Sequence, residues 1–451
     1  MKYEKVDNSQ EDLFRSRLSN QINMNHELIK LSKQIDWSFI EEEIKKISPE
    51  KKGAGRNALP IRLVVGLLIL QHMNNLSDEE VVSKWLENPY WQYFCGYDYL
   101  QIEFPLDASS LTRWRKRIGS KGLEKLLEAS IKTALQIGAT KKKYLENVSA
   151  DTTVMPKNIT YPTDTKLLHK AITKMTKLAK KYNLKLRQSY KFKAKRLVIQ
   201  AAKLMHSKKF KLANRELKAL KTITGRVMRD CARKIIDKPD LHKEFDNILR
   251  QAQHLISRQK GDKNKIYSLH EEEAVSCISK GKVHKKYEFG CKVGLGFTNE
   301  GLGLCTAVKT FHDNPHDSKT LQPILDLSEK TSSVKVESSF VDKGYRGHGV
   351  KDIKVYISGQ RKGVTPKIKK QIRRRQAIEA HIGHAKSECK LGLSRLKGKI
   401  GDEVNALMTG IAYNFKQLMN FIMPIFEKLI ASNIYLLSNF RYDCKYLYSK
   451  N

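Results

Sequence analysis

The sequence predicts an α/β core that a basic helical insertion interrupts after the first strand and that a helical domain precedes. Residues 144–155 have strand character, a long basic helical segment follows them, and strand character returns only near Lys265. Strands and helices then alternate up to about residue 390, which is typical of a mixed sheet covered by helices. We therefore expect a helical N-terminal domain (1–140), an α/β core (141–160 and 262–400), a helical insertion (161–261) and a C-terminal helical segment (401–451).

Three helical segments predict the N-terminal domain. Leu59-Pro60 opens an apolar helix that runs through Met73, and residues 77–80 start a second helix with acidic side chains in its first turn. Residues 107–110 cap a third helix that runs to Ile118. The basic face of this third helix consists of Arg113, Arg115, Lys116 and Arg117. The pattern is compatible with a helix-turn-helix-like DNA module and equally with a plain helical bundle that has a solvated basic face.

The insertion carries much of the positive charge. From Lys166 to Arg229 there are 21 Lys and Arg residues and a single acid, Glu216. Apolar residues recur mostly every three to five positions, which indicates amphipathic helices. Because unrelieved like charge destabilises an isolated helix, contact with DNA phosphates explains this segment better than a solvated surface does.

The rest of the core is predicted from its turns and strands. Residues 287–297 and 302–311 form two strand-like runs joined by a turn at 298–301, which predicts a hairpin. The segments that follow are, in order, a capped helix (317–327), a strand (334–341), a short strand (355–358), a basic helix (366–390) and an apolar helical stretch (402–440).

Composition narrows the class of partner. Lys and Arg outnumber Asp and Glu by 85 to 47, and the resulting formal net charge of +38 attracts polyanions. We expect double-stranded DNA as the partner, with an anionic membrane surface as the competitor. The longest apolar run, residues 63–70, is too short to span a bilayer, and residues 1–10 do not resemble a signal peptide. Seven cysteines without a C-x-x-C pair indicate reduced thiols in the cytosol and no structural zinc.

Three acids stand out by position. Asp151 lies in the first predicted strand, Asp342 ends a later one, and Glu379 lies on the basic helix. Strand ends and a facing helix are where an α/β sheet gathers side chains into one pocket. Mg²⁺ prefers carboxylate oxygens and completes its shell with waters and substrate phosphates. Two such ions about 4 Å apart activate an attacking oxygen and stabilise a leaving oxygen at phosphorus. We therefore predict a Mg²⁺ site, with Mn²⁺ as a substitute.

The helix that carries Glu379 has a mixed face. At 100° per residue, Arg375, Glu379 and Lys386 lie within about 40° of one another on the helix wheel. A metal-binding carboxylate would then lie between two phosphate-binding cations. Ordinary ion pairing between residues four apart on an exposed helix explains the same spacing.

Five segments resemble those of bacterial insertion-sequence DDE transposases, most closely the fifth insertion-sequence family, which is allied to the fourth. They are ADTTVMPKNI (150–159), HEEEAVSCISKGK (270–282), KYEFGCKV (286–293), VDKGYRG (341–347) and RRRQAIEAHIGHAK (373–386). They occur in the expected order, and residues 59–119 also resemble the N-terminal domain of that group, so the similarity covers nearly the whole chain.

The resemblance implies a ribonuclease H-like catalytic core with Asp151 on its first strand, Asp342 after its fourth and Glu379 on the following helix. It implies metal-dependent cleavage and strand transfer by a homodimer bound to the terminal inverted repeats and to target DNA. The expected location is then the bacterial cytosol, at the nucleoid when DNA is bound. Allied families carry a tyrosine, arginine, glutamate and lysine pattern; Arg375, Glu379 and Lys386 match it, whereas Ile372 occupies the tyrosine position.

Several residues allow two interpretations. Glu271, Glu272 and Glu273 form an acid-rich segment, which we expect to be a solvated or metal-adjacent loop because consecutive acids cannot converge on one ion. His381 and His384 are expected to be structural or to contact phosphate and not to bind metal. Lys343 and Arg346 follow Asp342, so they either contact the DNA backbone or belong to a glycine-rich turn.

Two other functions compete with strand transfer. One is a nuclease of the same fold that hydrolyses DNA without joining it. The other is a non-catalytic basic DNA-binding protein, which gives no reason for acids at these three positions.

Overall fold

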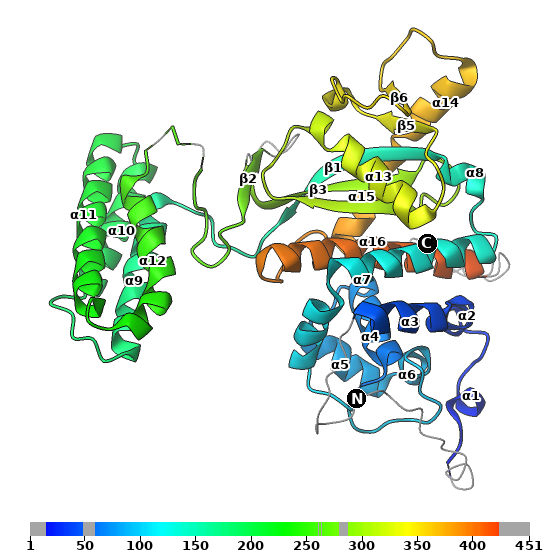
Figure 1. Ribbon diagram of the computed structural model, residues 1–451, viewed down its shortest axis with the longest axis horizontal. Coiled ribbons are helices and arrows are strands. Elements are labelled where there is room, and N and C mark those ends of the chain that lie inside the picture. The colour runs from blue at the N-terminus through cyan, green and yellow to red at the C-terminus, as the bar shows by residue number, and fades with distance from the viewer. Residues whose placement is uncertain (1–14, 48–58, 260, 263, 279–286, 424–451) are drawn as a thin grey trace, which may run out of the picture.

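A computed structural model describes residues 15–47, 59–259, 261–262, 264–278 and 287–423 (Figure 1). The fold is a mixed α/β sheet with helices on both faces, a helical N-terminal part and a separate helical bundle. No helix in these ranges is long and apolar enough to cross a membrane. Residues 424–440 of the predicted C-terminal helical stretch, and 279–286 of the motif segments, lie outside the described residues.

Helices are the regular elements of the described residues up to 145. They are α1 (Leu18–Gln21), α2 (Glu27–Gln34), α3 (Trp37–Ile47), α4 (Ile61–Met73), α5 (Asp78–Glu87), α6 (Pro89–Phe94), α7 (Ser109–Gln136) and α8 (Lys142–Leu145). Helix α4 is buried from Leu63 to Met73, as expected of a helix that is apolar all round. Ser77 and Glu80 form the reciprocal capping box that starts α5. Both helix starts predicted from the sequence are confirmed.

The third predicted helix is longer than expected. Helix α7 does not end at Ile118 but continues to Gln136 through a kink at Gly119, whose φ of 59° favours glycine. The apolar pattern resumes after the kink with the buried Leu123, Leu126 and Leu127. The buried second half therefore makes α7 part of the core.

Arg115 corrects the predicted basic face of α7. Leu111, Trp114 and Ile118 form the buried stripe of this helix, and Arg115 falls within it at helical spacing. Its side chain is 4 % exposed and donates to Asp78 Oδ2 at 2.9 Å and to Gln71 Oε1 at 2.8 Å. It therefore joins α7 to α4 and α5 and is not available to DNA.

Within the described residues the sheet has six strands. They are β1 (Asn147–Pro156), β2 (Val275–Ile278), β3 (Tyr287–Thr298), β4 (Cys305–Phe311), β5 (Ser338–Val341) and β6 (Lys354–Ile357). Their order is β2-β3-β1-β5-β6, and β4 also pairs with β3. Strand β3 runs antiparallel to β1 and β4, whereas β5 runs parallel to both β1 and β6. The β3–β4 hairpin is confirmed; the strand predicted at 334–341 is shorter and begins at Ser338.

Side chains alternate between the two covered faces of the sheet. Val148 and Ala150 of β1 pack against α13 (Leu321–Ser332), and Met155 belongs to the core that includes α16 (Gly398–Ile422). Helix α16 packs against β4, α4 and α7, and Figure 1 shows α7 and α16 running side by side beneath the sheet. The C-terminal helix is therefore part of the shared core of the sheet and the N-terminal helices.

The insertion forms a four-helix bundle with its own core. Its helices are α9 (Asp164–Lys181), α10 (Lys191–His206), α11 (Phe210–Ile235) and α12 (Pro239–Ser257). Leu168, Ile172, Leu220 and Phe245 are among its buried side chains. Figure 1 shows the bundle (green) apart from the sheet.

Candidate active site

Asp151 and Asp342 meet at one edge of the sheet. Strands β1 and β5 are parallel neighbours in which Ser149 pairs with Phe340, so two residues further along Asp151 lies beside Asp342. Asp342 directly follows β5 and caps a short 3-10 helix, η3 (Lys343–Tyr345), by accepting the Gly344 N–H at 2.9 Å. Parallel pairing thus brings together two carboxylates that are far apart in sequence.

Arg375 lies between Asp151 and Glu379. The alternation along β1 directs Asp151 toward the face covered by α15 (Ala377–Glu388). Arg375 Nη1 is 3.6 Å from Asp151 Oδ2, and its Nη2 is 4.0 Å from Glu379 Oε1. Asp151 also accepts the Thr152 N–H at 2.8 Å on its other oxygen. Asp151, Asp342 and Glu379 therefore share one edge of the fold.

The predicted basic helix at 366–390 is two helices. Helix α14 (Pro366–Arg374) ends one residue before Arg375, and α15 begins at Ala377. The turn between them carries Arg375 inward, so only 8 % of it is exposed and its guanidinium faces Asp151. Arg375 therefore does not lie on one continuous helix with Glu379 and Lys386, as the sequence predicted.

Glu379 lies at the outer rim of this site. Its side chain is 76 % exposed and sits in the first turn of α15, where a carboxylate is favoured by the helix dipole. Lys386 is half-buried near the other end of that helix. The structure thus places two acids inside the sheet edge and the third where an incoming ligand can reach it.

Like charge and burial raise the pKa of Asp151 to about 6. Burial is the largest cause, and the Asp342 and Asp317 carboxylates act in the same direction; the Thr152 N–H and Arg375 oppose them. A carboxylate with a raised pKa is one whose charge the protein alone does not stabilise. Carboxylate oxygens in that state are suitable ligands for a divalent cation.

Asp317 belongs to this edge and was not predicted as a site residue. It opens the 3-10 helix η2 (Asp317–Lys319) ahead of α13, and its Oδ1 accepts the Thr152 hydroxyl at 2.7 Å. Lys292 Nζ lies 3.1 Å from the same oxygen. From the sequence, Asp317 was predicted only to start a capped helix. The signal that could have identified it is an acid at the start of a helix that covers a strand end.

The exposed cations near the acids are Lys343 and Arg346. They flank Tyr345, which is fully buried against α13. Burial raises the pKa of the Tyr345 hydroxyl, as do the nearby Asp151, Asp317 and Asp342 carboxylates.

On α7, Arg113, Lys116 and Arg117 are exposed, in contrast to Arg115.

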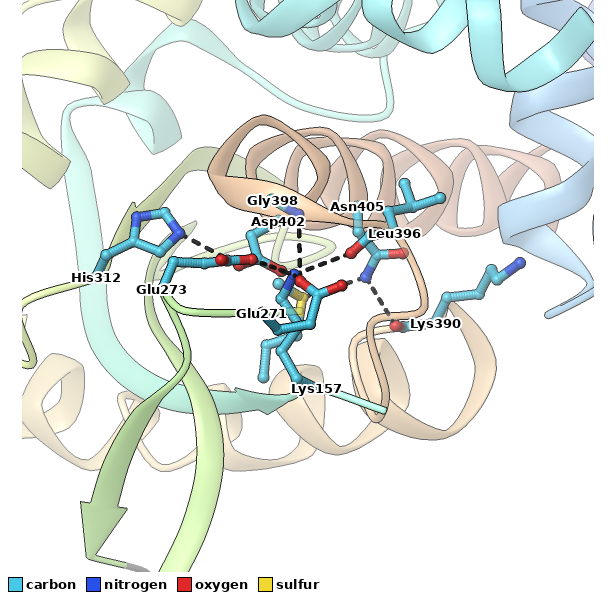
Figure 2. A network of polar contacts seen from close by, with 10 residues as sticks. Lys157, Glu271, Glu273, His312, Lys390, Leu396, Gly398, Asp402 and Asn405 are labelled. Atoms are coloured by element: carbon cyan, nitrogen blue, oxygen red, sulfur yellow. Dashed lines mark hydrogen bonds and ion pairs between the residues drawn. The ribbon is translucent and has the colours of Figure 1, made fainter. Parts of the chain in front are cut away.

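Glu271 is buried and Glu273 is half-buried, which corrects the expected solvated loop (Figure 2). Lys157 Nζ is 2.6 Å from Glu271, 2.9 Å from Glu273 and 3.1 Å from Asp402. Glu272 points the other way and contacts Arg250 and Gln251 of the bundle. Residues 271–274 form a turn in which the Ala274 N–H donates to the Glu271 carbonyl at 3.2 Å, so Glu272 lies on the side opposite Glu271 and Glu273.

A second group of potential metal ligands lies beside this network. Cys291, His312 and Asp402 each place one ligand atom within 4.8 Å of the others, and His312 Nε2 is 3.2 Å from Asp402 Oδ2. The Lys157 ammonium already lies against Asp402 and supplies the positive charge there. We therefore interpret this group as part of a structural ion network.

His381 and His384 make structural contacts. His381 Nδ1 is 2.7 Å from the Tyr413 hydroxyl and its ring packs on Phe297, while His384 Nδ1 is 2.7 Å from Glu388 Oε1. Neighbouring side chains of the fold therefore hold both rings.

Comparisons with known proteins point to the same class. The family described as "Transposase domain (DUF772)" matches residues 16–117, and the family described as "Transposase DDE domain" matches residues 257–415, which include Asp342 and Glu379. A Rhizobium meliloti protein described as "Uncharacterized protein ORF8 in nfe locus" is 47% identical over 199 residues, which are 44% of this chain and 95% of the relative.

No solved structure matches the chain significantly. The two family matches lie on either side of the helical insertion and confirm the resemblance that the motifs indicated. The chain belongs to the DDE transposases of insertion sequences.

Proposed function

We propose that this transposase cleaves the ends of its own insertion sequence and joins the freed 3′-hydroxyls to target DNA, using Asp151, Asp342 and Glu379 as ligands of divalent metal ions. The proposal rests on the position of Asp151 on β1, next to Asp342 at the end of the adjacent parallel strand β5. Glu379 lies on the helix that follows Arg375. The match to the DDE domain covers Asp342 and Glu379 and gives those two acids their chemical context.

The sheet supports a ribonuclease H-like core. Three antiparallel strands in the spatial order β4-β3-β1 continue into the parallel β5 and β6, and the insertion leaves the core after β1. The carboxyl ends of parallel strands are where α/β folds place their functional groups. The proposed catalytic core comprises residues 141–160 and 262–400.

The residues of the site would each have a separate task. When bound, Mg²⁺ or Mn²⁺ supplies activation of the attacking oxygen and stabilisation of the leaving oxygen. The Thr152 and Gly344 N–H groups fix the orientation of Asp151 and Asp342. Arg375 holds Asp151 toward Glu379, and the exposed Glu379 closes the site from outside. Lys343 and Arg346 are placed to bind the phosphates next to Asp342.

DNA would be held by three basic surfaces. In the insertion (161–261), every Lys and Arg from 166 to 229 is exposed except Lys170, Lys174 and Lys221, which are half-buried. The other two surfaces are the α7 cations and the segment 361–399, which has 13 Lys and Arg against Glu379 and Glu388. Such cations bind phosphates by releasing counterions. The proposed DNA contacts remain Lys386 and the α7 cations of the N-terminal domain (1–140), which are Arg113, Lys116 and Arg117.

The substrates would be the terminal inverted repeats and target DNA. Both ends of the element must be processed together, so we expect a homodimer on DNA, working at the nucleoid in the cytoplasm. The C-terminal segment (401–451) contributes the helix α16, which supports the sheet.

Asp342→Ala is expected to lose both cleavage and joining by at least about a thousandfold, because several kcal/mol of transition-state stabilisation depend on the metal site. The assay uses labelled DNA carrying the element's ends, with Mg²⁺ or Mn²⁺, and measures DNA binding in parallel. Binding should persist in the variant, and the exposed Asp352→Ala should behave like the native protein.

Nicking without joining by the native protein would contradict strand transfer and favour a nuclease. Cleavage that is equal in the native protein and Asp342→Ala would contradict the assignment of the site. Tight binding without cleavage by either protein would favour a DNA-binding role.

A further inference from the structure

Helix α10 of the insertion has a solvent-facing side that the bundle core does not use. Its buried side chains are Ala194, Leu197 and Ala201, and the helix packs against α9 and α11. At about 100° per residue, Phe192 and Ile199 fall on the other side of the helix, and they are 84 % and 48 % exposed. The bundle lies apart from the sheet (Figure 1). Two large apolar side chains on one helix face are therefore left in contact with water.

Cations alternate with these two apolar side chains. Arg196 and Lys203 follow Phe192 and Ile199 at a spacing of four residues each, so all four lie within about 60° of one another on the helix wheel. We call these four residues the α10 stripe. Both cations are exposed, and neither side chain makes an ion pair or hydrogen bond with the described part of the chain. Glu216 is the only acid between residues 165 and 229. The α10 stripe is thus both apolar and basic, in a segment almost without acids.

The dimensions of the α10 stripe fit the major groove of DNA. From Phe192 to Lys203 it spans about three helical turns, or about 16 Å, which corresponds to about five base-pair steps. The major groove admits an α-helix and presents the thymine methyl groups, which apolar side chains contact. The phosphates that border the groove are partners for cations on the same helix. Length, charge and apolar content therefore all agree with this one partner.

Other partners fit the α10 stripe less well. A helix that lies in a membrane surface needs a broad apolar face, whereas the broad apolar face of α10 is already buried in the bundle. A second copy of this chain would place like charges opposite one another, which opposes association. The charge of the stripe favours a polyanion.

We infer that α10 enters the major groove of the element's end DNA, where Phe192 and Ile199 contact thymine methyl groups and Arg196 and Lys203 bind the bordering phosphates. This inference rests on the proposed function, because it takes the element's ends as the partner. Contacts to phosphates alone do not distinguish one sequence from another, whereas contacts to base edges do. The insertion therefore contributes to sequence recognition as well as to affinity.

Uracil in place of thymine tests these contacts, because it removes only the methyl group from the major groove. Fluorescence anisotropy measures binding of the full-length protein to the element's end DNA, with one thymine replaced at a time. We expect replacement at one or two thymines, within about five base pairs of each other, to weaken binding of the native protein by about threefold or more. The α10 double variant (Phe192→Ala with Ile199→Ala) should bind unmodified DNA more weakly and be insensitive to uracil at those positions.

The matched control is the α11 double variant (Phe210→Ala with Leu212→Ala), which removes a similar pair of side chains that are 54 % and 49 % exposed. It should keep the native sensitivity to uracil. The salt dependence of binding should be unchanged in the α10 double variant, which keeps every charge, and shallower in Lys203→Gln.

Uracil sensitivity that is equal in the native protein and the α10 double variant, or absent from both, would overturn the inference. An α10 double variant that binds DNA normally but loses binding to phosphatidylserine vesicles would show that the stripe contacts a membrane surface instead. The proposed function fails separately, if the native protein neither prefers the end DNA to scrambled DNA nor cleaves it.

Discussion

Asp151→Asn is expected to raise the stability of the metal-free protein at pH 7.5 while reducing DNA cleavage by about a thousandfold or more. The two effects have one cause, since the fold holds Asp151 in a place that disfavours its charge. Burial and the neighbouring Asp342 and Asp317 raise its pKa from 3.8 to about 6. An uncharged amide of the same shape removes that penalty and also removes a metal ligand.

The direction of the pH dependence follows from the linkage between folding and the ionisation of Asp151. Because the folded-state pKa lies above the unfolded one, the stability that Asp151 contributes is fully present below pH 3.8 and is lost as the pH rises through about 6. The advantage of Asp151→Asn should therefore grow between pH 4 and pH 6 and reach up to about 3 kcal/mol above that window.

Thermal unfolding in EDTA at pH 5.0 and pH 7.5 measures this effect, with the exposed Asp352→Asn as control. Adding Mn²⁺ should raise the Tm of the native protein and not that of Asp151→Asn, because only a ligand bound to the folded state stabilises it. A variant that is no more stable than the native protein at pH 7.5 without metal would contradict the electrostatic description of the site.

Lys157→Met is expected to destabilise the protein by about 3 to 5 kcal/mol, because it leaves buried carboxylates without their counter-charge. Lys157 follows β1 directly and joins it to Glu271, Glu273 and Asp402, of which Asp402 is fully buried. Burial disfavours the charged form of Glu271, and the hydrogen bond with Glu273 acts in the same direction, so the pKa of Glu271 is raised. Of these two acids, Glu271 therefore holds a proton more readily. The loss should therefore shrink in acid, where more carboxylates are protonated.

Urea denaturation at pH 7.5 and pH 5.0 measures the loss. Lys177→Met is the matched control because Lys177 is exposed on α9, and its substitution should change the free energy of unfolding by less than about 0.5 kcal/mol. Equal effects of the two substitutions would show that the Lys157 network does not stabilise the fold. Glu271→Gln should be milder than Lys157→Met, because it removes one acceptor and not the only ammonium among these groups.

Local signals predicted much of the fold and part of the site. The capping box at Ser77, the hairpin turn after Thr298 and the strand before Asp342 depend on neighbouring residues, so the sequence displays them. Asp151 was recognisable because its segment has strand character and matches a motif. The edge position of Asp342 followed from its place at the end of a strand.

The errors concern partners distant in sequence. Arg115 was counted with its basic neighbours because nothing local shows that Asp78, 37 residues away, would pair with it. Its place within an apolar stripe was a signal of burial. Arg375 was placed on one helix face with Glu379 and Lys386 because a continuous helix was assumed where the chain turns.

Asp317 and the acids at 271–273 show a second limit. The significance of Asp317 depends on how two faces of a sheet converge at one edge, which no sequence spacing expresses. Consecutive acids were not expected to converge on one partner, but Glu271 and Glu273 both reach Lys157. That outcome depends on the turn at residues 271–274, which the run of acids did not indicate.

Iron cleavage of the backbone locates the metal most directly. With Fe²⁺ in place of Mg²⁺, ascorbate and peroxide generate hydroxyl radicals at the bound ion, and these cut the nearest peptide segments, which mass spectrometry identifies. In the full-length protein bound to its end DNA, cuts are expected beside Asp151, Asp342 and Glu379, and they should disappear in Asp342→Ala. Cuts centred on Cys291 and His312, or an unchanged pattern in Asp342→Ala, would contradict a metal site at the edge formed by β1 and β5.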